Sequence, residues 1–375
     1  MKISLKYAKL IALFISLTFL TGCWDQKQYE DIGFILQMGL EMEQGDKLLF
    51  SMTAPVVSPD VEKKVEFLYS SNENLIRSSR EEIRNVSGKL LQGGKVQILY
   101  FSKELARQGI NEYFDIFLRD PENPLLSNVV VVDKSPREMM ELSLNYKDKP
   151  RSAIYAAELL RDARRRMAIP ETRIYKFSTL YYSKTIDPVT PLFRYNDKEF
   201  EVSGSALFSG DKMVGEIDQD QTKILNVLMG EKQAFEYIYR GHVQGDGKDK
   251  LQKGAAVYLK NKKNKIKIDT RAKDPVIAIT LGFNASIDEY SGKHNLDQVK
   301  NQENFEKILA GSIYLDVIKL IKQLQEAGAD PIGFGERVRA KQNSYWKSVD
   351  WKKVYKNARI KLSVDVELET YGTIR

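Results

Sequence analysis

Histidine and cysteine, the side chains that most often serve as catalytic bases or bind zinc and iron, are scarce in this chain of 375 residues. Cys23 is its only cysteine, and His242 and His294 are its only histidines. A serine or cysteine nucleophile needs a base within hydrogen-bonding reach, most often histidine. Both histidines lie in polar, glycine-containing stretches, and the chain has no G-x-S-x-G motif. We therefore predict no catalytic set, no cofactor and no metal, because a zinc or iron site needs several thiol or imidazole ligands.

The residues before Cys23 explain why a single thiol is present. The stretch MKISLKYAKL carries three lysines, and Leu10 to Leu20 form an apolar run. This pattern is typical of a secretory signal, and the run is too short for a helix that spans a bilayer core of about 30 Å. Leu20-Thr21-Gly22-Cys23 is similar to a bacterial lipobox, in which the cysteine is lipidated and becomes the new N-terminus. We predict a signal peptide at residues 1–22 and a diacylglyceryl anchor on Cys23; the alternative is a free thiol beside an ordinary cleavage site.

An anchor of this kind places two acyl chains in the membrane. Each buried methylene contributes about 0.8 kcal/mol, so two chains hold the protein far more firmly than one chain does. We therefore expect a mature chain that is anchored at the extracytoplasmic face and does not span the membrane. The formal net charge is +7, and signal cleavage removes three lysines from it. The basic runs at 161–166 and 260–267 are interpreted as solvated, the first on a helix and the second at a hairpin tip. Binding of nucleic acid or lipid headgroups by these runs is the less favoured alternative.

Strand and helix patterns are mixed through residues 23–197, which predicts an N-terminal α/β domain with a sheet covered by helices. Residues 75–90 have apolar side chains on one side of a helix, and SNVVVVD at 127–133 is typical of a strand buried on both faces. Ser135-Pro136-Arg137-Glu138 has the sequence of a capping box with proline at the first helical position. The proline-containing segment 186–197 is the expected domain boundary.

Residues 198–252 predict a small middle domain that consists of a hairpin and a helix. Apolar residues alternate through 200–208, and a polar turn precedes a returning strand. Asp218 is placed to begin the helix and Gly230 to end it. Because such a unit buries little surface by itself, we expect it to pack on a neighbour.

Residues 253–375 predict a C-terminal α/β domain. Apolar residues recur every three or four positions from Phe305 to Leu324, which indicates a long helix that ends at Gly328. Residues 359–369 alternate strictly between polar and apolar, as in a strand with one face on a core. We predict a mainly antiparallel sheet with the long helix packed on it. The fold class of the whole chain is then α/β (α+β), with three consecutive mixed α/β domains.

The stretch PIGFGERVR at 331–339 contains a G-x-G pattern, but it follows a helix and lacks the third glycine of a dinucleotide-binding motif. It is interpreted as a turn whose glycines allow positive φ, with Phe334 covering a core. Tyr345, Trp346 and Trp351 follow closely and could belong to the core or to a partner surface. We favour the core.

Four separated stretches resemble the Ger(x)C family, the C subunits of bacterial spore nutrient germinant receptors. They are GCWDQKQYEDIGFILQMGLE, YFDIFLRDPENP with DPVTPLF, GSALFSGDKMVGEID, and LQEAGADPIGFGERVRAKQNSYWK. In the last stretch, Asp330, Pro331, Gly333, Phe334 and Gly335 match the family signature position by position. These five residues are therefore candidates for a partner surface or for a structural signature. The chain departs from the family pattern at LLQGGKVQILYFS, which lacks an expected histidine.

The resemblance implies three α/β domains in sequence and a non-enzymatic subunit that is needed for assembly or signalling of the receptor during germination. It implies the A and B membrane subunits of the receptor as partners. We expect no nucleic acid as a partner, because an exported protein rarely meets it. The resemblance also implies a lipid-held position on the outer surface of the spore inner membrane.

Two other functions remain as alternatives. A solute-binding lipoprotein that delivers a small nutrient to a membrane transporter would need two lobes around a polar cleft. A cell-wall hydrolase would need carboxylates that converge in a groove.

Overall fold

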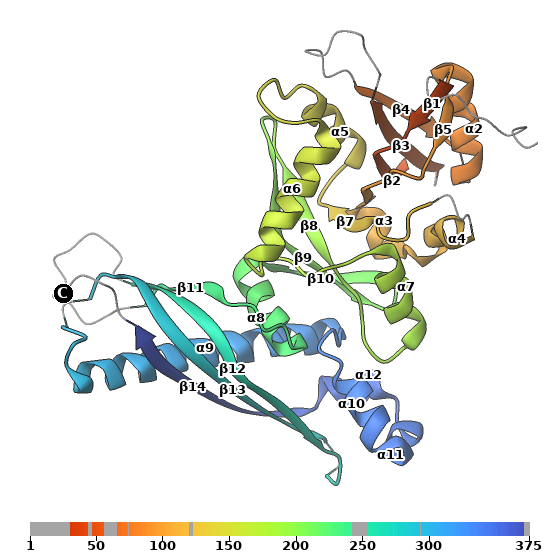
Figure 1. The fold of residues 1–375 in the computed structure, drawn as a ribbon. Coiled ribbons are helices and arrows are strands. Elements are labelled where there is room, and N and C mark those ends of the chain that lie inside the picture. Colours follow the sequence, from red (N-terminus) through yellow and green to blue (C-terminus); the bar gives the residue numbers. More distant parts are fainter. Residues whose placement is uncertain are drawn as a thin grey trace, which may run out of the picture.

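A computed structural model describes residues 31–43, 47–55, 66–73, 75–119, 123–241, 254–272, 274–292 and 294–370. Cys23, the predicted signal peptide and His242 lie outside the described residues. The described chain contains an eight-stranded sheet with helices on both faces, a four-stranded sheet with one long helix, and a two-stranded sheet (Figure 1). The prediction of a mixed α/β (α+β) fold is therefore confirmed.

The eight-stranded sheet is parallel in its middle and antiparallel at both ends. Its parallel strands lie in the order β2 (Gln37–Glu43), β6 (Ile98–Ser102), β7 (Asn128–Val132) and β8 (Val189–Tyr195). On the β2 side, the sheet continues with β3 (Lys47–Pro55) and then β4 (Glu66–Asn72). On the β8 side, it continues with β9 (Phe200–Ser209) and then β10 (Lys212–Asp218). The two-stranded sheet is β1 (Ile32–Phe34) with β5 (Leu90–Gln92).

The central strands are buried on both faces because helices cover the sheet from both sides. Leu99 and Phe101 of β6 belong to one hydrophobic core, and Ile98 and Tyr100 belong to another. Every residue of β7 is buried, which confirms the strand predicted at 127–133. Helices α5 (Pro136–Leu144) and α6 (Ser152–Arg165) cover one face. Helices α2 (Ile76–Ser87), α3 (Lys103–Gln108), α4 (Asn111–Arg119) and α7 (Ile174–Ser183) contribute to the core on the other.

The hairpin that the sequence assigns to a middle domain is hydrogen-bonded into the eight-stranded sheet. β9 pairs with β8 on one side and with β10 on the other, so the sheet continues past residue 197. The following helix, α8 (Gln219–Met229), begins at Asp218 with a complete capping box to Gln221 and ends at Gly230, as predicted. The division into domains at residues 197 and 252 stays a prediction, but the hairpin shares its sheet with the N-terminal part of the chain.

The second sheet has the strand order β11 (Phe235–Tyr239), β12 (Ala255–Asp269), β13 (Val276–Tyr290) and β14 (Arg359–Thr370). β12 runs antiparallel to both neighbours and β14 runs parallel to β13, so the sheet is mainly antiparallel, as predicted. The long helix α9 (Val299–Ala327) packs on it. Helices α10 (Phe334–Lys341), α11 (Asn343–Ser348) and α12 (Trp351–Lys356) connect α9 to β14.

The basic run 260–267 does not form a hairpin tip, contrary to the prediction. It lies inside β12, which pairs with β13 from Ala255 to Asp269 with a bulge between Asn261 and Lys263. The lysines can stay exposed within a strand because one face of this sheet is not covered by the helix.

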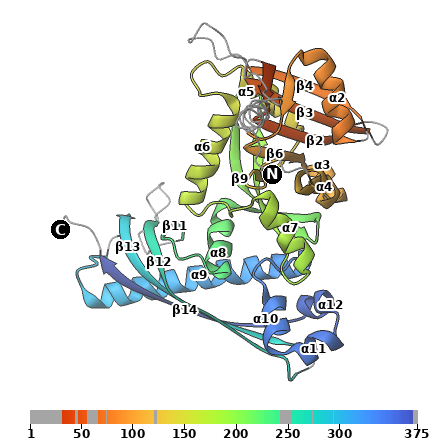
Figure 2. The same ribbon diagram turned by 45° about the vertical axis from the view of Figure 1, so that its right-hand side comes forward.

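A single hydrophobic core joins the two sheets. It runs from Leu207 and Ile217 of the large sheet through Leu225 and Leu228 of α8 to the strands and helix of the second sheet. Figures 1 and 2 both show α8 between the two sheets. One polar link at this place is Asn226, whose Nδ2 donates hydrogen bonds to two backbone carbonyls just after α6, Met167 O at 2.8 Å and Ile169 O at 3.1 Å.

Replacing Asn226 by alanine is expected to lower the free energy of unfolding by about 1–3 kcal/mol, because two buried carbonyls lose their donor. Chemical denaturation of the two proteins measures this difference. The matched control is Asn343→Ala, since Asn343 at the start of α11 is exposed and its side chain donates to Arg339 O of the adjoining helix α10. Equal losses in both variants would contradict the assigned role of Asn226.

Candidate functional site

The signature residues lie where α9 turns into α10, beside the end of the eight-stranded sheet. Gly328 ends α9 in the left-handed conformation with φ 68°, and the chain reaches α10 through Asp330 and Pro331. All five signature residues are buried. Their burial favours a structural role over direct exposure to a partner.

The Asp330 carboxylate accepts three hydrogen bonds from groups that surround it. Oδ1 accepts from the backbone N–H of Phe334 at 2.9 Å, and Oδ2 accepts from the N–H of Gly335 at 2.6 Å. The indole Nε1–H of Trp351 also donates to Oδ2, at 3.0 Å. The first two donors are unpaired N–H groups at the start of α10, where negative charge is favoured by the helix dipole. Asp330 therefore fixes α10 and α12 against the end of α9.

Asp187, in the loop between α7 and β8, connects this turn to the large sheet. Its Oδ2 accepts from the backbone N–H of Asp330 at 2.8 Å, and its own N–H donates to Asp330 O at 3.1 Å. Its Oδ1 accepts from the N–H of Gly210 in the β9–β10 turn at 2.8 Å. Lys352 Nζ lies 3.8 Å from Oδ1 and donates to Ser209 Oγ at 2.8 Å. Sequence analysis did not identify Asp187, although it lies within the DPVTPLF stretch.

The two signature glycines are required by backbone conformation and by space. Gly333 has φ 74° and precedes the first residue of α10. A Cβ on Gly335 would lie 2.7 Å from Trp351 Nε1. Phe334 is fully buried, with its ring 5.8 Å from that of Tyr355, which agrees with the predicted turn and core residue. Trp351 is also in the core.

A pocket of about 270 Å³ opens at this junction between the two sheets. It combines carboxylates, lysines and aromatic rings. The residues that line it are Lys184, Thr185, Ile186, Asp187, Gly328, Asp330, Trp346, Val349, Asp350, Trp351, Lys352 and Tyr355.

Burial dominates the electrostatics of this junction. It raises the pKa of Asp330 to about 6. The three hydrogen bonds lower this pKa, and the negative charge of the nearby Asp187 raises it further. Burial, together with the charges of Asp330 and Asp187, raises the pKa of Tyr355 well above 10. The Tyr355 hydroxyl is buried without a hydrogen-bond partner among the described residues. Both oxygens of the Asp330 carboxyl therefore already accept hydrogen bonds from within the protein.

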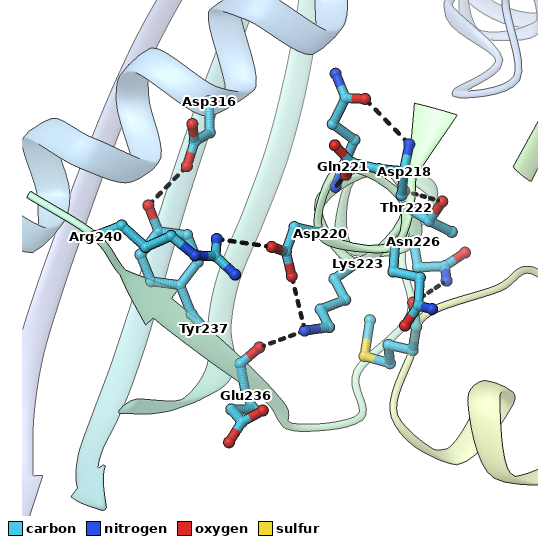
Figure 3. A network of polar contacts seen from close by, with 12 residues as sticks. Asp218, Asp220, Gln221, Thr222, Lys223, Asn226, Glu236, Tyr237, Arg240 and Asp316 are labelled. Carbon is cyan, nitrogen blue, oxygen red and sulfur yellow. Dashed lines mark hydrogen bonds and ion pairs between the residues drawn. The ribbon is translucent and has the colours of Figure 1, made fainter. Parts of the chain in front are cut away.

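A second polar network surrounds α8 (Figure 3). Asp220 binds Lys223 Nζ at 3.0 Å and Arg240 Nη1 at 3.0 Å, and Lys223 also donates to Glu236 O. The Tyr237 hydroxyl of β11 donates to Asp316 Oδ2 of α9 at 2.7 Å. These contacts tie α8, β11 and α9 together, and periodicity in the sequence gives no sign of them.

His294 is exposed in a loop before α9. Within the described ranges, no three His, Cys, Asp or Glu side chains come together as a metal site would require. None of the helices that the structure describes combines the length and apolar character needed to cross a bilayer. The signature residues thus lie at the junction of the two sheets in a mixed α/β protein.

Comparison with known proteins extends this assignment. A model described as "Spore germination protein N-terminal domain" matches residues 25–195, and one described as "Spore germination B3/ GerAC like, C-terminal" matches residues 203–372. The two matches cover nearly all of the chain and include both sides of the junction. The chain therefore belongs to the Ger(x)C family of spore germination proteins.

Individual relatives match this chain over nearly their full length. The chain is 25% identical to spore germination protein GerQC of Bacillus cereus, over 96% of this chain and 98% of that protein. It is 22% identical to spore germination protein B3 of Bacillus subtilis (strain 168), over 98% of both chains. The crystal structure of the GerBC protein matches with a TM-score of 0.57 and 16% identity, over 88% of this chain and 96% of that chain. This structural match supports the fold.

Replacing Asp330 by asparagine is expected to destabilise the protein in a pH-dependent manner. The carboxyl pKa is about 6 in the folded chain and near 3.8 in an unfolded one, so the folded state binds more protons between these values. The stability that Asp330 contributes therefore falls as the pH rises through this window. In thermal unfolding, Asp330→Asn should be less stable than the wild type, and this difference in stability should shrink as the pH rises from about 4.5 to 7. A deficit that is independent of pH would contradict this account.

Replacing Gly335 by alanine is expected to lower the free energy of unfolding by about 1–3 kcal/mol, because the added Cβ overlaps Trp351. The matched control is Gly311→Ala in α9, where a Cβ meets nothing within 4 Å. This control should be neutral or stabilising by up to about 1 kcal/mol, since alanine favours a helix. Denaturant titration distinguishes the two, and similar effects at both positions would refute the steric argument.

Proposed function

We propose that this chain is the lipid-anchored C subunit of a spore nutrient germinant receptor, and that it acts in assembly or signalling of the receptor without catalysis. The observation that carries the proposal is the pair of family matches, which span residues 25–195 and 203–372. Relatives that match over nearly their full length are named spore germination proteins. Its partners are then the A and B membrane subunits of the receptor.

The lipobox-like sequence before Cys23 supports an anchor on the outer surface of the spore inner membrane. In this proposal the diacylglyceryl group is the only part of the mature chain that enters the bilayer. Two acyl chains are sufficient for stable attachment.

The buried signature supports a non-catalytic role. The carboxyl of Asp330, whose pKa burial raises to about 6, accepts three hydrogen bonds from the backbone of α10 and from Trp351. The solute-binding alternative is less well supported, because the two sheets share one hydrophobic core beside their pocket of about 270 Å³ and do not form two separate lobes.

Replacing Cys23 by alanine is expected to release most of the protein from spore membranes and to impair nutrient-triggered germination. Thr21→Ala is the matched control, since it keeps a small residue and the cysteine in the lipobox-like sequence. Membrane fractionation with an antibody, and germination assays on the same spores, measure the two effects.

Unchanged membrane association of Cys23→Ala would refute the anchor. Co-purification from spore membranes tests the partners separately: the wild-type chain should bring down the A and B subunits. Their absence, with the chain still anchored, would refute the receptor assignment alone.

A further inference from the structure

β14 is an edge strand of unusual length. It pairs with β13 on one side, and no described strand pairs with its other side. It has 12 residues, whereas strands of five or six are common. A long unpaired edge is a template for pairing with another chain.

The backbone of β14 directs alternate residues to the free side. The N–H of Arg359 donates to Pro275 O beside β13, so the odd-numbered residues face the paired side. The register with β13 is unbroken from Arg359 to Leu368, so the even-numbered residues Ile360, Leu362, Val364 and Val366 direct their N–H and C=O groups outward.

At one end of the strand the free side is already occupied. Glu306 Oε1 of α9 accepts from the N–H of Leu368 at 2.8 Å, and Gln302 Nε2 donates to Leu368 O at 3.3 Å. The segment that is available for pairing is therefore 359–367.

The charges on the exposed face of this segment are complementary to those of a second copy of the segment that runs antiparallel to it. Arg359 and Lys361 are at its start, Ser363 is in the middle, and Asp365 and Glu367 are at its end. All five are exposed. An antiparallel copy centred on Ser363 would place Arg359 opposite Glu367 and Lys361 opposite Asp365. Opposite charges across an antiparallel pair stabilise it, and like charges destabilise it.

We propose that two copies of this chain associate through β14, antiparallel about a two-fold axis at Ser363, so that their four-stranded sheets become one eight-stranded sheet. In this register Ile360 lies opposite Val366 and Leu362 opposite Val364. Ile360, Leu362 and Val364 are only half-buried in the single chain, so the second copy adds apolar contact to the hydrogen bonds. The bonds of Leu368 to α9 stay intact.

Disulfide trapping tests the register. In the proposed register, Ser363 of one chain lies opposite Ser363 of the other, and these two residues share no backbone hydrogen bonds. The Cα atoms of such a pair are about 4.5 Å apart, which is within disulfide range. The full-length Ser363→Cys chain, purified in detergent, should form a covalent dimer on oxidation. Lys361→Cys is the matched control. Residue 361 of one chain lies about four residues along the strand from residue 361 of the other, so the two thiols are too far apart to form a disulfide and no covalent dimer should form. The wild-type chain, whose only cysteine is Cys23, shows whether a covalent dimer can form through Cys23 instead.

Charge reversal tests the complementarity. Lys361→Glu places two acids opposite each other at both ends of the pair and should weaken the dimer about tenfold in sedimentation equilibrium. Adding Asp365→Lys in the same chain restores opposite charges and should restore the affinity. A wild-type chain that stays monomeric at all concentrations, with no Ser363→Cys dimer, overturns the proposal. A Ser363→Cys dimer that the charge variants do not affect would overturn the charge argument.

Discussion

The buried carboxylate of Asp330 is the interaction on which the arrangement of this protein depends. Removing a charge from water is costly unless hydrogen bonds replace the solvent. Here three N–H donors replace part of the solvent, two from the start of α10 and one from Trp351, and burial still raises the pKa of Asp330 to about 6. The main chain of Asp330 exchanges further bonds with Asp187. One residue therefore holds the end of α9, the start of α10, α12 and the loop before β8 in a single arrangement.

The helix α8 supplies the second connection between the two sheets. Its apolar face belongs to the core that both sheets share, and its polar residues bind β11 and the chain after α6. The sheets cannot separate without exposing this core and breaking buried hydrogen bonds. For a subunit that is proposed to act in receptor assembly or signalling, a single body of this kind presents its surfaces at defined relative positions.

The elements predicted best are those that local residues determine. The capping box of α8 needs only Asp218 and Gln221, and the stripe of α9 needs only its own periodicity. Of the helix predicted at 75–90, residues 76–87 form α2, whereas Leu90 begins β5. Leu75 and Val86 are 66% and 76% exposed, although both are predicted on its apolar side. Periodicity predicts a helix, whereas the neighbours that pack on it decide how wide its buried face is.

The sequence by itself determined the family, the presence of the signature, the buried strand β7 and the long helix, because these follow from residues that are close together in the chain. The tertiary structure decided that the hairpin after residue 197 joins the large sheet, and that Asp187 meets Asp330, 143 positions away. It also decided that the basic run lies inside β12. Such pairings depend on hydrogen bonds between distant segments, and these form only when the whole chain brings donors and acceptors together.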